Sequence, residues 1–248
     1  MKLKHLLFGA IAIVSSLLIS SSSCKLSTSP AAGVTQAHPL PTFLERLPSN
    51  DQGDYFDLIE ITPVGYLIWS QFPVTIYVEP LAKAAGNHQE NTAEQVRQQQ
   101  WLTAVETAIQ EWHQYLPIEQ TEDSKSANIA ILRLPVERKI KLDPETGLYD
   151  IPRAITAQTT YQIYLSQPEQ ILAHQMKLQI SPDLSPTATL SAARHELGHA
   201  LGIWGHSDRT TDALYFSQVR DTPTISSRDL NTLKKIYQQP TKLGWQIN

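Results

Sequence analysis

The sequence predicts an α+β domain in which strands and a long helix precede a second helix, an irregular loop and a closing helix. Residues 67–80 and 154–165 combine β-branched and aromatic residues with alternating polarity, which is typical of strands. Residues 92–112 repeat apolar residues at helical spacing. Residues 185–201 open with a serine cap, and residues 226–237 open with a candidate capping box from Ser226 to Asp229. Glycine or proline lies beyond the end of each segment, so each is expected to be a helix.

Residues 1–24 have the layout of an export leader. A basic start precedes an apolar run from Leu6 to Ile19, which is shorter than a transmembrane helix usually needs, and small residues follow. Cys24 resembles the acylated cysteine of a bacterial lipoprotein, although Ser21 stands where a lipobox has a leucine-like residue. We therefore expect an exported protein that is secreted, periplasmic or tethered to the membrane of the cell envelope by a lipid anchor.

The expected domain is preceded by a linker and followed by a short tail. Residues 25–64 are expected to be linker and approach segment, because the stretch up to about residue 54 is rich in Ser, Pro, Thr and Ala and its prolines break any period. The folded domain is expected over residues 65–240 and a tail over residues 241–248. A chain of 248 residues allows one domain of ordinary size but hardly two.

Composition excludes two classes of protein. The net charge is −4 and no basic run stands out beyond the N-terminus, so nucleic acid is not an expected partner. Cys24 is the only cysteine, which excludes an intramolecular disulfide framework and a cysteine-rich zinc ribbon. Any metal must therefore be bound by His, Asp or Glu.

The elements before the second helix follow from their patterns. A strand is expected after Pro73, where apolar residues alternate, and residues 127–134 are expected to form a buried strand. The helix at 92–112 has a candidate capping box from Thr92 to Gln95. Its apolar stripe comprises Trp101, Ala104, Val105, Ala108, Ile109 and Trp112. In 154–165 the expected core face comprises Ile155, Ala157, Tyr161, Ile163 and Leu165. His113 and His174 lack partner spacing and are expected at the surface or as caps.

Residues 194–207, with the sequence RHELGHALGIWGHS, indicate a metal site on the helix that Ser185 caps. His195 and His199 are four residues apart, so both imidazoles lie on one side of the helix and can bind a single ion. Zinc accepts neutral imidazole nitrogens, and a catalytic zinc site uses three protein ligands. A third ligand is therefore expected nearby.

The third ligand is expected just beyond the helix. Gly202 can end the helix in a left-handed conformation and turn the chain back toward the metal. His206 is the expected third ligand, with Gly205 beside it to supply an unusual backbone angle, and Asp208 is the reserve ligand. Glu196 is not expected to bind the metal but to orient a metal-activated water and take its proton as general base.

The motif HELGHALGIWGHS closely resembles the HExxHxxGxxH zinc signature of the metzincin peptidases, and HELGHALG is similar to the matrixins, in their bacterial type. The similarity covers about residues 65–240. It implies a twisted, mostly parallel sheet above the active-site helix, and a secreted zinc-dependent endopeptidase with a polypeptide substrate. Residues 154–165 resemble the family's edge strand, which binds extended substrate by main-chain pairing. Residues 214–225 are expected to wall the pocket for the residue after the scissile bond.

Three features depart from the matrixin pattern. His206 comes one position late, so the loop must absorb a residue. Leu214 stands where the family has the methionine of its turn below the metal, and its similar volume preserves a hydrophobic floor. Cys24 lies in the leader, so the family's cysteine-switch propeptide has no counterpart. Tyr215, next to the floor residue, is expected either to donate a hydrogen bond to the oxyanion or simply to pack.

A second function is compatible with these departures. The domain could be a metal-binding or adhesion module that kept the fold and lost turnover. Zinc retention without cleavage by the wild-type protein would identify it. The sequence does not decide calcium binding or oligomeric state.

Overall fold

The computed structural model describes residues 35–48, 50–81, 93–136, 141–142, 144, 149–150, 156–217, 219 and 222–247. The expected leader with Cys24 lies outside the described residues, as does Thr92 of the candidate capping box. The described residues all belong to one compact unit, Ala32–Asn248. In the described part of the chain, no helix combines the length and apolar character needed to cross a bilayer.

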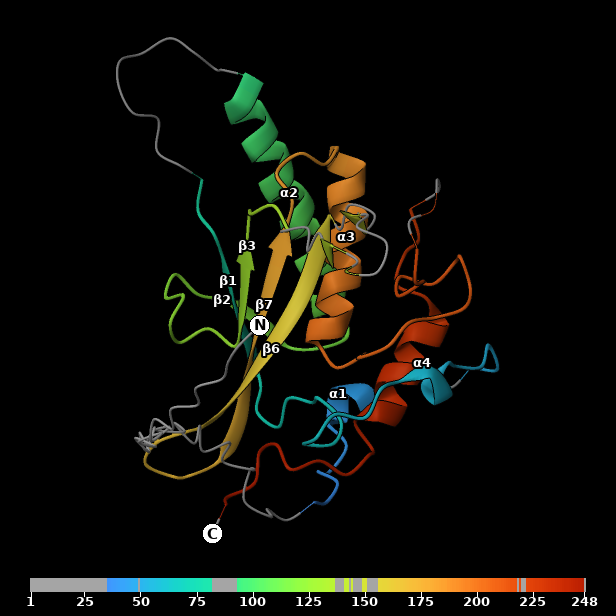
Figure 1. The fold of residues 1–248 in the computed structure, drawn as a ribbon. Helices are drawn as coiled ribbons and strands as arrows, with labels where there is room; N and C mark the ends of the chain where they lie inside the picture. Colours follow the sequence, from blue (N-terminus) through green and yellow to red (C-terminus); the bar gives the residue numbers. More distant parts are fainter. Residues whose placement is uncertain are drawn as a thin grey trace, which may run out of the picture. The chain divides into compact units, whose positions relative to one another are not determined.

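A five-stranded, mostly parallel sheet forms the centre of the unit (Figure 1). In spatial order its strands are β2 (Ile118–Gln120), β1 (Val74–Val78), β3 (Ile129–Leu132), β7 (Leu172–Ile180) and β6 (Ala157–Leu165). The pairs β1–β2, β1–β3 and β3–β7 are parallel, and only β6 runs antiparallel to its neighbour in this sheet. A separate short antiparallel pair consists of β4 (Lys141–Leu142) and β5 (Tyr149–Asp150). This architecture confirms the predicted α+β class, and β6 is an edge strand.

Two long helices lie side by side against the sheet (Figure 1). Helix α2 (Ala93–His113) buries every residue of the predicted apolar stripe, because residues at spacings of three and four share one helix face. Helix α3 (Pro186–Ala200) packs against α2 and against strands β6 and β7. Arg194 on α3 ties the helices together, since its Nη2 donates to Glu111 Oε1 at 2.8 Å and its carbonyl accepts from Trp112 Nε1 at 3.0 Å.

Local capping signals define the starts of α3 and of the last helix, α4 (Ser227–Ile236). Ser185 Oγ accepts from the backbone N–H of Ala188 at 3.3 Å. Ser226 Oγ accepts from the Asp229 N–H at 3.0 Å, and an Asp229 carboxylate oxygen accepts from the Ser226 N–H at 2.7 Å. The predicted cap and capping box are both confirmed.

The structure corrects two expectations about strands. Strand β7 was not predicted, although its residues alternate between buried and less buried positions. His174 lies on its buried face at 3% exposure and stacks on Trp69 with ring centroids 3.9 Å apart, so it is neither a surface nor a capping residue. In β6, Ile163 and Leu165 are exposed, so the predicted core face covers only the first part of that strand, and Ile155 lies outside the described residues.

The described part of the expected linker is integral to the core. Helix α1 (Thr42–Glu45) buries Leu44 completely, and the 3-10 helix η1 (Phe56–Leu58) follows the buried Tyr55. The expected tail also packs, because Thr241 pairs with Gln36 and both Thr241 and Leu243 are buried. The apolar residues of both segments are isolated and show no helix or strand period. The sequence therefore predicted a linker at residues 25–64 and a tail at residues 241–248.

Replacing Leu44 with alanine tests whether this segment contributes to stability. Because the side chain is fully buried, Leu44→Ala is expected to lower the free energy of unfolding by about 2–5 kcal/mol. Urea denaturation measures this change. The matched control is Leu58→Ala, because Leu58 is 49% exposed and its replacement should change the free energy of unfolding by less than about 0.5 kcal/mol. Equal stability of the two variants would mean that the segment does not contribute to the fold.

Candidate metal centre

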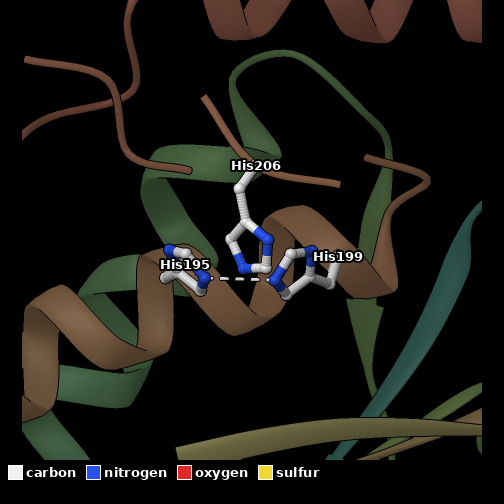
Figure 2. A group of neighbouring side chains, drawn as sticks. All are labelled: His195, His199 and His206. Carbon is white, nitrogen blue, oxygen red and sulfur yellow. Dashed lines mark hydrogen bonds between the residues drawn. The ribbon is translucent and has the colours of Figure 1, made fainter. Parts of the chain in front are cut away.

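Three imidazoles converge at the C-terminal half of α3 (Figure 2). His195 and His199 project from one side of the helix, and His206 reaches them from the loop that follows. One ring nitrogen from each residue lies within 4.8 Å of those of the other two. Among the described residues, these three form the only group of His, Cys, Asp or Glu with metal-binding geometry.

Backbone carbonyls fix the orientation of the two helical imidazoles. His195 Nδ1 lies 2.9 Å from the carbonyl oxygen of Ala213, and His199 Nδ1 lies 2.7 Å from that of Ile203. A carbonyl can only accept, so each Nδ1 carries the proton and donates it. Each Nε2 then presents a lone pair toward the centre of the cluster, which is the arrangement found in metal-bound histidines.

Burial keeps these imidazoles neutral. It lowers the pKa of His195 to about 4 and lowers the pKa of His199 well below its usual value. His206 is exposed, and its partial desolvation lowers its pKa against the opposing charge of Glu60. The Nε2 atoms of His195 and His199 are 3.0 Å apart, and two lone pairs at that distance repel unless a cation lies between them. Three neutral imidazoles are a donor set that fits zinc.

Two glycines let the chain return to the helix after His199. Gly202 has a φ of +132°, in the region that disfavours side chains, and a Cβ there would lie 3.0 Å from the carbonyl oxygen of Leu67. Gly205 does not have the unusual angle expected for it. It pairs with Ile59, and an added Cβ would lie 2.9 Å from the Ile59 Cα. The constraint at Gly205 is therefore close packing against the N-terminal segment.

Glu196 and Tyr215 line a cleft of about 670 Å³ beside His195. Burial raises the pKa of Glu196 to about 7, and hydrogen bonding from Thr159 opposes that rise. Tyr215 is half-buried and packs against Phe216 with ring centroids 4.5 Å apart. Several residues of the expected wall at 214–225 also line this cleft: Tyr215, Phe216, Ser217, Val219, Thr222 and Pro223. Its chemistry is that of a buried carboxyl group beside a three-nitrogen metal site.

The family model of the matrixins matches residues 87–238, which is more than half of the chain. The chain belongs to the matrixin family. The resemblance to the matrixins is thereby confirmed, without their bacterial type, and the domain is in general terms a zinc metallopeptidase domain. No curated protein matches the chain closely enough to be compared with it.

Asp208, the reserve ligand, lies outside the histidine group of this matrixin domain. Its side chain is 68% exposed and Oδ1 accepts from Arg228 Nη2 at 3.2 Å. The late third histidine is therefore accommodated by the loop itself, which brings His206 rather than Asp208 to the cluster.

Helix α4 anchors the loop that carries His206. Arg228 Nη1 donates to Asp212 Oδ2 at 2.6 Å, and the same carboxylate accepts from Ser207 Oγ. Asp229 Oδ2 accepts from the Ala213 N–H at 2.9 Å, next to the carbonyl that orients His195. The capping-box pattern predicted Asp229 as a capping residue, but no sequence signal indicated that α4 contacts the metal loop.

Leu214 is completely buried against α3 in this matrixin domain. A Cβ added to Gly198, between the two helical histidines, would lie 2.5 Å from Leu214 Cδ2. Gly198 therefore allows the leucine to approach the helix directly beneath the histidines. The missing methionine is replaced here by a leucine that fills the space under the helix backbone.

Replacing His206 with alanine tests the third ligand. His206→Ala is expected to weaken zinc binding by more than ~100-fold, because losing a ligand should exceed the 10–100-fold cost of losing an outer-shell partner. Asp208→Ala should bind zinc as the wild type does. Competition with a chromophoric chelator measures both, and the reverse ranking would assign the ligand to Asp208.

Replacing Arg228 with methionine tests the anchor between α4 and the metal loop. Arg228→Met leaves the buried Asp212 carboxylate without its cation, so the free energy of unfolding should fall by about 3–5 kcal/mol. Arg209→Met, an exposed substitution in the same loop, should change it by less than about 0.5 kcal/mol. If chemical denaturation gave matching values for both variants, Arg228 would not hold the loop.

Proposed function

We propose that this matrixin domain is a secreted zinc-dependent endopeptidase in which Glu196 is the general base. The observation that carries the proposal is the convergence of three neutral imidazoles beside a buried carboxyl group in one cleft. His195, His199 and His206 would hold the zinc. When bound, zinc supplies a Lewis acid that polarises the scissile carbonyl and lowers the pKa of the attacking water.

Glu196 moves the proton in this proposal. A carboxyl group with a pKa near neutrality can accept a proton from the attacking water and return it to the leaving amine. Glu196 would be ionised more readily beside a bound cation, whose charge would oppose the effect of burial. Tyr215, in the same cleft, is the proposed donor to the oxyanion.

The open edge of β6 is the proposed binding site for the polypeptide backbone. Among the described residues β6 pairs with β7 alone, so we propose that backbone groups along its other edge bind an extended chain. The cleft beside His195 would take the side chain that follows the scissile bond. Its described lining includes small and uncharged residues such as Ala188, Ala192 and Val219, which leaves room for a bulky uncharged side chain.

Replacing Glu196 tests the proposed chemistry. Glu196→Ala should bind zinc and lose cleavage of an unfolded protein by about 10²–10⁴-fold, the usual contribution of a general base. Glu119→Gln, an exposed change on β2, should cleave as the wild type does. If both the wild type and Glu196→Ala bound zinc and neither cleaved the substrate, the result would instead support a metal-binding or adhesion module.

Export and a lipid tether are proposed from the sequence of residues 1–24. Fractionation of cells expressing the full chain should place it in the envelope or the medium. If Cys24 carries the lipid, Cys24→Ser should move the protein from the membrane to the soluble fraction. Wild-type protein retained in the cytosol would contradict export, and an unchanged membrane fraction for Cys24→Ser would contradict lipidation.

A further inference from the structure

We propose that Thr159 is a positioning residue, which holds the Glu196 carboxylate in place and couples it to the strand edge that binds substrate. This inference rests on the proposed role of Glu196. Thr159 lies on β6 and was not distinguished by any sequence pattern. Its side chain belongs to neither the metal ligands nor the apolar core.

The contact between the two side chains is short and buried. Thr159 Oγ1 lies 2.6 Å from Glu196 Oε2 and 3.1 Å from the Glu196 carbonyl oxygen. A hydroxyl has one proton to donate, and the shorter distance assigns it to the carboxylate, where the bond is charge-assisted. Thr159 is 8% exposed and Glu196 7%, so bulk water competes little for this bond. The hydroxyl therefore holds Oε2, and the backbone N–H of Thr159 also hydrogen-bonds to this carboxyl group.

The backbone of Thr159 faces the open edge of the sheet. The Ser181 N–H donates to the Thr156 carbonyl at 2.8 Å, which makes residues 156 and 181 a hydrogen-bonded pair across β6 and β7. Such pairs alternate along an antiparallel ladder, so residues 158 and 160 also bond to β7, whereas the N–H and C=O of Thr159 point away from it. The Thr159 N–H hydrogen-bonds to Glu196, so an extended substrate on this edge would pair with the carbonyl of the residue whose hydroxyl holds Glu196.

Thr159 thus positions both the substrate chain and the Glu196 carboxylate. The backbone of Thr159 sets where the substrate chain lies, and its hydroxyl sets where the Glu196 carboxylate lies. Without the hydroxyl, the carboxylate loses the contact at Oε2 and is freer to rotate about its side-chain bonds. The expected consequence is a slower chemical step with substrate binding largely intact.

Isosteric replacement separates the hydroxyl from the shape of the side chain. Thr159→Val is expected to lower kcat by ~10–100-fold, as for outer-shell partners in metal sites, with KM and zinc content little changed. Thr159→Ser restores a hydroxyl and should recover most of the rate. Thr160→Val is the matched control, because Thr160 is half-buried on the opposite face and its backbone pairs with β7. Wild-type kcat in Thr159→Val, or a change confined to KM, would overturn the proposal.

Crystal structures of the zinc-loaded variants give a readout that does not depend on turnover. The Glu196 carboxylate should be fixed in the wild type and in Thr159→Ser, and rotated or disordered in Thr159→Val. An unmoved carboxylate in Thr159→Val would overturn the positioning role even if the variant were slow. If the carboxylate moved but the wild type itself cleaved nothing, the positioning role would stand and the proposed peptidase activity would fail.

Discussion

The metal centre depends on one electrostatic constraint, which is the 3.0 Å separation of the Nε2 atoms of His195 and His199. Both Nδ1 atoms donate to backbone carbonyls, so both Nε2 atoms present lone pairs in a part-buried site. A cation relieves this repulsion, and a third imidazole from His206 adds a ligand. The helix supplies the spacing, but the orientation of each ring comes from segments that follow it in the chain.

Those segments are held by parts of the chain that lie far apart in sequence. The carbonyl that orients His199 belongs to Ile203, which follows the left-handed turn at Gly202. The carbonyl that orients His195 belongs to Ala213, whose N–H is bound by Asp229 of α4. Residues 59 and 60 contact the same loop, because Ile59 pairs with Gly205 and the Glu60 N–H donates to the Trp204 carbonyl. Both ends of the domain thus support the metal centre.

Features encoded locally were predictable from the sequence, and features that depend on distant contacts were not. The buried stripe of α2 and the capping box of α4 follow from residue spacing, and both were predicted correctly. Strand β7 alternates buried with less buried residues, but it was missed because Ile180 is its one β-branched residue and it contains no Phe, Tyr or Trp. The linker was misjudged because its buried residues are isolated, and the contacts of Arg228 and Thr159 join elements whose proximity no local pattern specifies.

X-ray absorption spectroscopy at the zinc edge tests the central claim most directly. Purified protein loaded with one equivalent of zinc should show three imidazole nitrogens at about 2.0–2.1 Å, and His206→Ala should show two. Zinc coordinated by carboxylate oxygens in place of an imidazole, or an unchanged spectrum in His206→Ala, would contradict the three-histidine site.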